Sequence, residues 1–508
     1  MPHQPGSLKP PFVTAISTLS SWAAFFIFGH FRDFLVFWFY RPTKKTPKGY
    51  APIRQDYEDF YTRRMYYRIH DAFNRPIASA PNSEMKVLER TSTVVGGANG
   101  TQGLELTGGQ KDVLNLGSYN YLGFAARDDY CTPRVLDTLK ECGWSTCASR
   151  TQAGSSPIHR QLERAIADFL GKEDAIVLGM GFATNSMILP ALIGKGSLII
   201  SDALNHASIV AGVRGSGAKV KVFEHNNPDS LEAVLRNAIA QGQPRSGRAW
   251  KKVLIVTEGI FSMEGEACEL AGIVAVAKKY KAYVFLDEAH SIGALGKTGR
   301  GITEHAGVST SDIDVMMGTF TKSFGAAGGY IASSRAVVQH LRDTSPAHIS
   351  ATAMSPPVAQ QIISALTLIQ GRDDVGDGRG QRKMDQLKQN ANFFREGLEG
   401  MGLNVLGDQD SPVMPIMLFQ PAKIPAFSRL CLQRGVAVVV VGFPATPLLS
   451  ARCRICISAS HTRAQLERAL EVIDEVADLC GLKHFPQTKS LDIKSKPELA
   501  LPAAASSL

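Results

Sequence analysis

The stretch LAGIVAVAKKYKAYVFLDEAH, residues 270–290, joins a helix pattern directly to a strand pattern. From Leu270 to Ala277 the apolar residues follow the i, i+3, i+4, i+7 spacing of a helix that packs one face on a sheet. The run that follows, residues 282–287, is short and apolar and ends in the carboxylate of Asp287. A helix that leads into a buried strand in this way is typical of an α/β protein with a parallel sheet.

Similar patterns alternate on both sides of this stretch, so we expect a large, doubly wound and mainly parallel sheet. Its expected strands are residues 174–180, 197–202, 219–225, 252–258, 282–287, 313–319 and 328–333. A smaller C-terminal α/β unit should follow, with strands near 413–419 and 436–442 and a helix over 466–476 that is opened by a capping box of Thr462 and Gln465.

A chain of 508 residues exceeds the size of one hydrophobic core, so we expect several packed units. Its net charge of +9 comes from basic residues that are spread along the chain, which argues against a nucleic-acid partner. Eight cysteines at irregular spacing indicate free thiols in a reducing compartment. The expected segments are a membrane-associated part (1–50), an N-terminal extension (51–113), a large cofactor-binding domain (114–345), a small C-terminal domain (346–482) and a disordered tail (483–508).

The N-terminal segment has the length and composition of a membrane helix. No Asp, Glu, Lys or Arg occurs from Phe12 to Phe31, and the aromatic residues Trp22 and Trp38 suit a membrane interface. The basic residues between Arg41 and Lys48 favour a cytosolic position for the chain that follows. The polar residues Thr14, Ser17, Ser20 and Ser21 weaken the case for a full span. A spanning and an interfacial helix therefore both stay open, beside a buried core helix or a transit peptide.

Two of the predicted strands end in polar residues that could act together on one ligand. Asp287 ends an apolar strand, and a carboxylate buried there needs a cation such as a protonated pyridine nitrogen. His290, three residues on, could donate to the phenolic oxygen of the same ring. Lys322 follows another strand within GTFTKSFG, residues 318–325, where it could carry the cofactor as a Schiff base. Taken alone, Lys322 could equally be a lysine in a surface turn.

Further candidates surround the same predicted sheet edge. Gly181 and Phe182 open a helix after a strand, so the helix amides could hold the cofactor phosphate, with Thr319 and Thr321 as hydroxyl donors. His206 follows another strand and could stack on the cofactor ring, although a lone histidine there is more often a helix cap or a core residue.

Arg454 lies in an alternating strand near the C-terminus, and its guanidinium fork suits a substrate carboxylate. An exposed arginine on an edge strand is the alternative. Cys453 and Cys456 form a C-x-x-C pattern, but an odd separation places them on opposite faces of a strand. We therefore expect no metal site.

Taken in order and spacing, these segments resemble the α-oxoamine synthases, pyridoxal-phosphate enzymes of fold type I, the aspartate-aminotransferase-like fold, which condense an amino acid with an acyl-CoA. The resemblance covers about residues 114–480. Its landmarks are Asn115–Gly123, Gly154–His159, Asn205–Ser208, Glu258–Met263, Asp287–His290 and Thr319–Gly325.

The resemblance also implies roles for single residues. Within the family, the segments Gly318–Gly325 and Val441–Pro447 look most like the lysine-bearing subunit of the eukaryotic enzymes that act on L-serine and palmitoyl-CoA. The implied catalytic residues are Lys322, His206 and Asp287; the implied cofactor-binding residues add His290, Thr319, Thr321, Gly181 and Phe182; and the implied substrate-binding residues are Arg454, Asn120 and Tyr121.

The implied reaction is the decarboxylating condensation of L-serine with palmitoyl-CoA to 3-ketodihydrosphingosine. The resemblance further implies a homologous, non-catalytic partner subunit, small membrane regulators, and an endoplasmic-reticulum membrane with the catalytic body in the cytosol. Two alternatives stay open. The chain could use another pair, such as glycine with succinyl-CoA, alanine with pimeloyl-CoA or glycine with acetyl-CoA, or it could be a non-catalytic membrane scaffold. The preferred acyl-chain length is not determined by the sequence.

Overall fold

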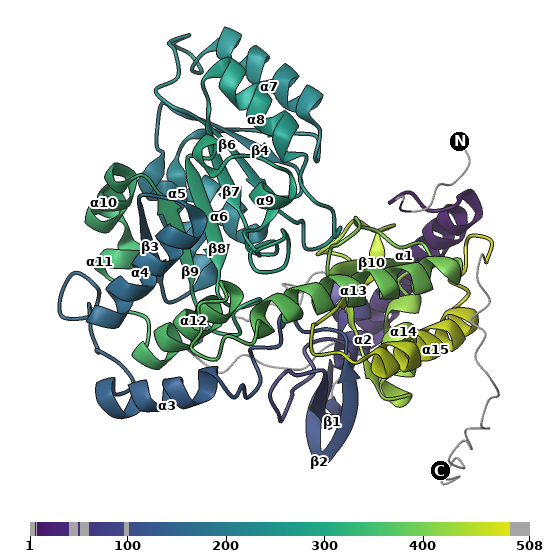
Figure 1. Ribbon diagram of the computed structural model, residues 1–508. Coiled ribbons are helices and arrows are strands. Elements are labelled where there is room, and N and C mark those ends of the chain that lie inside the picture. Colours follow the sequence, from purple (N-terminus) through teal and green to yellow (C-terminus); the bar gives the residue numbers. More distant parts are fainter. Residues whose placement is uncertain (1–5, 7, 40–48, 51–59, 96–100, 488–508) are drawn as a thin grey trace.

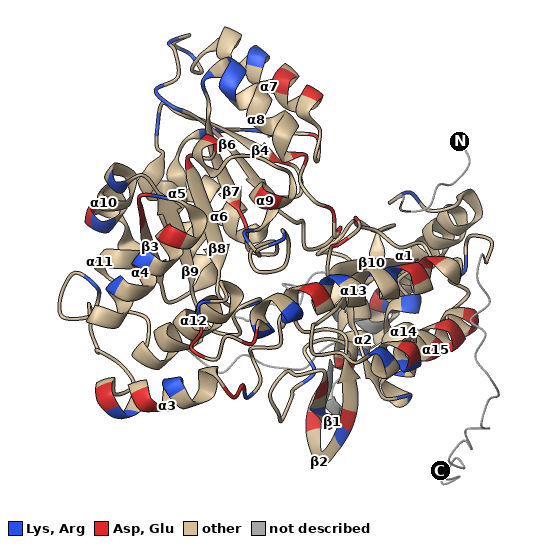
Figure 2. Ribbon diagram, viewed as in Figure 1, with Lys and Arg blue, Asp and Glu red and all other residues tan. Residues whose placement is uncertain are grey.

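The computed structural model describes residues 6, 8–39, 49–50, 60–95 and 101–487 (Figure 1). A large α/β unit and a smaller C-terminal unit lie side by side, joined by the long helices of the C-terminal half. Lys and Arg are distributed over both units rather than gathered on one face (Figure 2).

The large unit is built on one seven-stranded sheet with the order β3-β9-β8-β7-β6-β4-β5. All neighbouring strands run parallel except β9, which is antiparallel to both β3 and β8. Its strands are β3 (Asp174–Leu178), β4 (Leu198–Asp202), β5 (Lys219–Phe223), β6 (Val253–Glu258), β7 (Tyr283–Asp287), β8 (Val315–Thr319) and β9 (Gly329–Ser333). All seven predicted strands are confirmed, and with them the mainly parallel sheet.

Helices cover both faces of this sheet, because successive side chains of each strand point to opposite sides. In β6, for example, Ile255 belongs to the core on one face and Leu254 and Val256 belong to the core on the other. One face packs on α5 (Gly181–Leu192), α6 (Ala207–Ser216) and α10 (Arg335–Thr344). The other packs on α4 (Pro157–Leu170), α7 (Pro228–Gln241), α8 (Leu270–Tyr280) and α12 (Pro356–Ile369).

The smaller unit contains two three-stranded sheets, one of which is completed by the N-terminal extension. The hairpin of β1 (Glu84–Val95) and β2 (Thr101–Asn115) pairs in parallel with β11 (Val436–Ala437). The second sheet has the order β10-β13-β12, with β10 (Val413–Phe419), β13 (Ala451–Cys456) and β12 (Val439–Val441). Helices α13 (Arg379–Gly400), α14 (Lys423–Gln433) and α15 (Arg463–Cys480) belong to the same unit.

Short helices connect these parts, namely η2 (Thr62–Tyr66), α2 (Tyr67–Ile69), η3 (His70–Ala72), α3 (Cys131–Cys142), α9 (Ile302–His305), η4 (Thr310–Asp312) and α11 (Pro346–Ile349). The predicted capping box is present, since Thr462 and Gln465 each accept from the other's backbone amide at the start of α15. The five-segment division of the chain stays a prediction, and most of the tail that was expected to be disordered lies outside the described residues.

Helix α1 (Phe12–Phe39) is long and apolar enough to cross a membrane over Phe12–Leu35. One face rests on the smaller unit: Trp22 and Thr18 are buried, and Gln420 Nε2 donates to Ser17 Oγ (2.7 Å). The hydroxyls of Ser17 and Thr18 donate to the Thr14 carbonyl one turn earlier, which satisfies these polar groups inside the helix. The opposite side exposes large apolar residues, among them Phe12, Val13, Ile16, Ile27, Phe28, Phe31 and Phe34.

Candidate active site

The carboxyl ends of β4, β6, β7 and β8 open into one cavity of about 900 Å³. This is the edge of an open α/β sheet at which ligands bind, because loops rather than covering helices follow the strands there. The cavity brings together predicted residues that are up to 273 positions apart in the chain. Nine of the predicted site residues line it: Lys322, Asp287, His290, His206, Thr319, Thr321, Gly181, Phe182 and Arg454.

Asp287 lies at the end of β7 and is 3% exposed. One carboxylate oxygen accepts from Asn185 Nδ2 (2.7 Å) and the other from the Ala289 amide (2.9 Å). Within the described chain, no Lys, Arg or His forms an ion pair with it at 4.0 Å or less. A buried carboxylate with two neutral donors and no cation fits a protonated ring nitrogen, which would supply the missing charge.

Lys322 follows β8 and faces the same cavity. Burial lowers the pKa of its amine to about 8, against the opposing attraction of Asp287 and Glu258. An amine with this pKa is partly neutral near pH 7 and can act as a nucleophile or a base, which a surface lysine does poorly. Its Nζ also lies 5.4 Å from the centroid of the Tyr119 ring. The alternative of a surface-turn lysine is therefore excluded by position.

The start of α5 has an uncapped helix N-terminus next to two hydroxyl groups. A Cβ atom at Gly181 would lie only 2.7 Å from Thr319 Oγ1, so a side chain there would fill the space between the helix and β8. No side chain caps this helix, which leaves its first amides free to face an anion. The hydroxyl oxygens of Thr319 and Thr321 lie 2.9 Å apart beside it.

The two predicted histidines occupy different environments. His206 caps α6 and its Nδ1 lies 2.7 Å from Ser208 Oγ, while its ring lines the cavity next to Phe182. It therefore caps a helix and faces the site at once. His290 is buried at the cavity wall, and its Nδ1 lies 2.7 Å from the Tyr121 hydroxyl. Burial lowers the pKa of both rings, which favours neutral imidazoles.

Arg452 and Arg454 point to the same side of β13 because they are two residues apart. Arg452 is neutralised by Glu264 at 2.9 Å. The guanidinium of Arg454 instead lies 4.4 Å above the Tyr119 ring, its Nη1 is 3.7 Å from Met263 Sδ, and it has no carboxylate partner in the described chain. Its Nε also has no hydrogen-bond partner there. Arg454 is thus the cavity arginine whose charge is still available for an anion.

Asn120 and Tyr121 are the two predicted residues that the structure does not place on the cavity wall. The Asn120 side chain donates to the Pro81 carbonyl (3.0 Å) and accepts from the Ala125 amide (3.1 Å). Tyr121 is fully buried behind His290. The polar groups of both side chains form contacts within the fold, where they stabilise the loop before the large unit.

Several residues that line the cavity were given no role from the sequence, among them Asn185, Glu258 and Ser262. Glu258 ends an apolar strand as Asp287 does, so the same pattern could have found it. Asn185 lies one helical turn after Gly181, but only the folded chain shows its contact with Asp287. Ser262 lies in a loop with no periodic signal. Burial raises the pKa of Glu258 well above its usual value, which favours the neutral acid.

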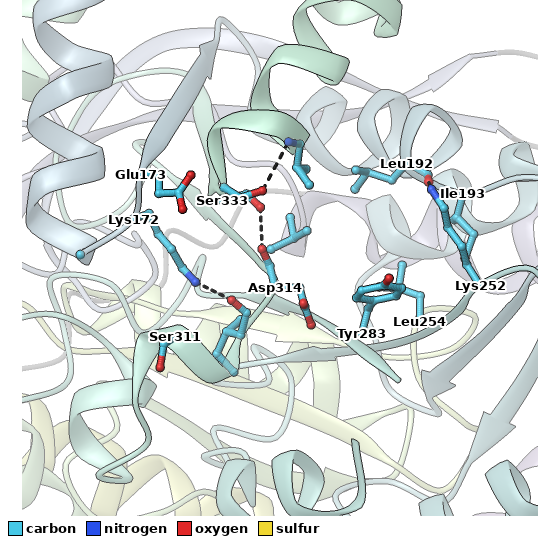
Figure 3. Close-up of a pocket in the computed structure, with 15 residues that line it drawn as sticks. Lys172, Glu173, Leu192, Ile193, Lys252, Leu254, Tyr283, Ser311, Asp314 and Ser333 are labelled. Atoms are coloured by element: carbon cyan, nitrogen blue, oxygen red, sulfur yellow. Dashed lines mark hydrogen bonds between the residues drawn. The ribbon is translucent and has the colours of Figure 1, made fainter. Parts of the chain in front are cut away.

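A second hollow of about 520 Å³ lies at the opposite, amino-terminal edge of the sheet (Figure 3). Lys172, Lys252 and Tyr283 lie around it, and the Ser333 hydroxyl donates to the Asp314 carbonyl (2.6 Å). None of the predicted site residues lines this hollow. The candidate chemistry therefore belongs to the cavity at the carboxyl edge.

Comparison with known proteins agrees with this geometry. Residues 111–473 match the family described as aminotransferase class I and II. The chain belongs to this family. Long chain base biosynthesis protein 2a of Arabidopsis thaliana is 57% identical over 97% of the chain and 99% of its own length. Serine palmitoyltransferase 2 of Dictyostelium discoideum is 53% identical over 89% of the chain and 90% of its own length.

Among solved structures, a serine palmitoyltransferase variant from S. paucimobilis with bound PLP and myriocin is similar, with a TM-score of 0.70 and 28% identity. The match covers 82% of this chain and 94% of that one. The resemblance to the α-oxoamine synthases, and within them to the lysine-bearing subunit of serine palmitoyltransferase, is thereby confirmed, as is the fold expected for family members.

Proposed function

We propose that this chain is the catalytic subunit of a pyridoxal-phosphate-dependent serine palmitoyltransferase, which condenses L-serine with palmitoyl-CoA to 3-ketodihydrosphingosine, the first step of sphingolipid synthesis. The observation that carries the proposal is the cavity that unites a buried carboxylate without a cation partner, Asp287, a half-buried amine, Lys322, and a guanidinium without a carboxylate partner, Arg454. The names of the relatives that match nearly the whole chain select serine and a long acyl chain within this class.

One orientation of pyridoxal phosphate would give each of these residues a partner. Asp287 would hold the ring nitrogen, Lys322 the aldehyde carbon, and the amides at Gly181 with Thr319 and Thr321 the phosphate. His206 would lie over the ring, and His290, kept in place by Tyr121, would face the phenolic oxygen. When bound, the cofactor supplies an electron sink that stabilises a carbanion at the amino-acid Cα.

The remaining steps depend on the chain's own side chains. Arg454 would bind the serine carboxylate through two parallel hydrogen bonds and thereby fix the orientation of the Cα–H bond. Lys322 Nζ, with its lowered pKa, would take the Cα proton and later return it. Asp287, fixed by Asn185 and the Ala289 amide, would keep the proton on the ring nitrogen throughout.

Two exposed apolar surfaces support the proposal of an enzyme that acts on a lipid together with a partner subunit. Met180, Phe182 and Leu204 line the cavity and are still 38–62% exposed, so the mouth of the site has an uncovered apolar rim. A homologous, non-catalytic subunit would cover this rim, and the exposed side of α1 would associate with the endoplasmic-reticulum membrane, with the catalytic body in the cytosol. Small membrane regulatory subunits belong to the same proposal.

A condensation assay tests the proposal. The chain, purified alone and together with the homologous subunit, is supplied with serine, glycine or alanine and with palmitoyl-, succinyl-, pimeloyl- or acetyl-CoA, and CoA release is measured. We expect release with serine and palmitoyl-CoA, and none in Lys322→Ala, which should still bind the subunit. A preference for glycine with succinyl-CoA, or for another short acyl-CoA, would assign another α-oxoamine synthase activity. Full activity in Lys322→Ala complexes would support the scaffold.

A further inference from the structure

His225 lies outside the cavity, on the loop between β5 and α7, and bridges two carboxylates. Its Nδ1 lies 2.8 Å from Asp202 Oδ1 and its Nε2 lies 3.2 Å from Glu266 Oε2. Because an ionised carboxylate only accepts hydrogen bonds, both contacts require a proton on the histidine, and the ring is then an imidazolium. Burial opposes that charge, but the hydrogen bonds to both carboxylates outweigh it and raise the pKa of His225 to about 10.

One of these carboxylates controls the loop that carries His206. Asp202 ends β4 and is 3% exposed. Its Oδ1 also accepts from the Leu204 amide (2.8 Å), which closes the turn that leads directly to His206. The same loop is held from the other side by Asn205, whose Nδ2 donates to the Val256 carbonyl (2.8 Å). The position of His206 in the cavity thus depends on the Asp202 turn.

The other carboxylate belongs to a different wall of the cavity. Glu266 lies in the loop that follows β6, and Ser262, Met263 and Glu264 of this loop line the site. Met263 and Glu264 in turn contact Arg454 and Arg452. The imidazole ring of His225 also packs edge-on against Phe261 of this loop, with ring centroids 4.3 Å apart.

Asn226 forms a second bridge between Asp202 and the loop that follows β6, with a backbone group in each contact. Its amide donates to Asp202 Oδ2 (2.9 Å), its Nδ2 donates to the Ala267 carbonyl (2.9 Å), and its Oδ1 accepts from the Glu269 amide (2.7 Å). Asn226 adopts a left-handed backbone conformation (φ 51°), which lets both its main chain and its side chain reach these partners. Residues 225 and 226 therefore join the two loops a few residues beyond β4 and β6, where the His206 amide already donates to Glu258 Oε1.

We propose that His225 is a positioning residue whose imidazolium sets the spacing between the His206 loop and the Ser262–Glu264 loop, and so shapes the cofactor and amino-acid end of the site. This inference rests on the proposed function, because it assigns His206 and Arg454 to the cofactor and to serine. On the apolar rim, Met180 and Phe182 lie at the start of α5 and form no hydrogen bond to this bridge in the described chain, and Leu204 contacts it only through its backbone amide. We therefore expect binding of the acyl-CoA at this rim to be independent of His225.

The test uses His225→Gln in the full chain, purified with the homologous subunit. His340→Gln is the matched control, since His340 is an exposed histidine on α10 whose ring contacts only the Ala191 carbonyl (3.0 Å) among the hydrogen bonds described. Cofactor affinity is measured by titration with pyridoxal phosphate and by the circular dichroism of the bound chromophore. The KM values for serine and for palmitoyl-CoA are measured separately.

For His225→Gln we expect the cofactor dissociation constant and the serine KM each to rise about tenfold, as for the loss of one charge-assisted hydrogen bond, with an unchanged KM for palmitoyl-CoA. The chromophore signal should fall, and His340→Gln should match the wild type. Equal KM values and an unchanged signal in His225→Gln would overturn the inference, as would a KM for palmitoyl-CoA that rises in parallel. If His225→Gln does not fold, Glu266→Gln decides by the same measurements, because it weakens the bridge and leaves the Asp202 contact intact.

Failure of the inference and failure of the proposed function are distinguishable. A wild-type complex that does not condense serine would refute the proposed function, while the cofactor titration of His225→Gln would still test the bridge. A wild-type complex that is active with serine, beside an unaltered His225→Gln, would refute the bridge alone.

Discussion

Replacing Arg454 by Ala should weaken serine binding without changing acyl-CoA binding. The guanidinium is half-buried above Tyr119, it has no carboxylate partner in the described chain, and its Nη1 lies 3.7 Å from the weak acceptor Met263 Sδ. A serine carboxylate would therefore be its first strong partner. A hydrogen bond to a charged group contributes about 1.5–3 kcal/mol, which corresponds to a serine KM raised roughly 10- to 150-fold.

The assay is CoA release by the purified complex at saturating palmitoyl-CoA with varied serine, and then the reverse. Arg454→Lys keeps the charge but cannot form two parallel bonds, so its serine KM should lie between those of the wild type and the alanine variant. Arg434→Ala is the control, because Arg434 forms an exposed pair with Glu475 and should leave the KM within about twofold. A serine KM that stays at the wild-type value in an Arg454→Ala complex that binds cofactor would refute the assignment.

Three further predictions concern the charged groups around the cavity. In the cofactor-free protein, acetylation of Lys322, measured by mass spectrometry, should rise with pH through about 8, because only the neutral amine reacts. Asp287→Asn should move the midpoint of this rise to lower pH, because it removes an attraction that raises the pKa of Lys322. A wild-type midpoint near that of free lysine would contradict the burial of the amine. Glu264→Gln should lower the free energy of unfolding, measured with denaturant, by about 3–5 kcal/mol, because it leaves the buried Arg452 without its ion-pair partner. Glu475→Gln, in the exposed pair with Arg434, should lower it by less than about 1 kcal/mol. Equal decreases in the two variants would be inconsistent with this reasoning. Asp202 and Glu266, with Glu264 also nearby, raise the pKa of His225 in the folded state to about 10. The stabilising effect of the imidazolium is therefore complete below about pH 6.5 and is lost as pH rises through 10. The unfolding temperatures of wild type and His225→Gln should converge over that pH range, and a constant difference between them would exclude the imidazolium.

The large sheet could be predicted from the sequence because its strands are short apolar runs separated by helices with a clear apolar face. Residues such as Asp287 and Lys322 could be found for the same reason, since polar groups at the ends of such strands converge on one edge of a parallel sheet. Arg454 was found because it alternates with buried residues on β13.

The parts that could not be predicted depend on contacts between distant segments. Asn185 reads as an ordinary helix residue until it meets Asp287, 102 positions away. Asn120 and Tyr121 stand in a motif with strong family resemblance, but their side chains turn into the fold, and no local pattern reports that direction. His225 carries no motif at all, because its role is to join carboxylates on two loops that are adjacent only in the folded chain.

The pairing of the early hairpin with β11 has a consequence for biosynthesis. Leu114 and Asn115 hydrogen-bond along Val436 and Ala437, so one edge of a sheet leaves the ribosome about 320 residues before the strand that covers it. At typical translation speeds this sheet edge stays unpaired for roughly 20–60 s. During that interval α1 has already emerged from the ribosome, so the nascent chain exposes both an apolar helix and an unpaired strand. The yield of this protein should therefore depend more on chaperones that shield strand edges than on the stability of the folded protein.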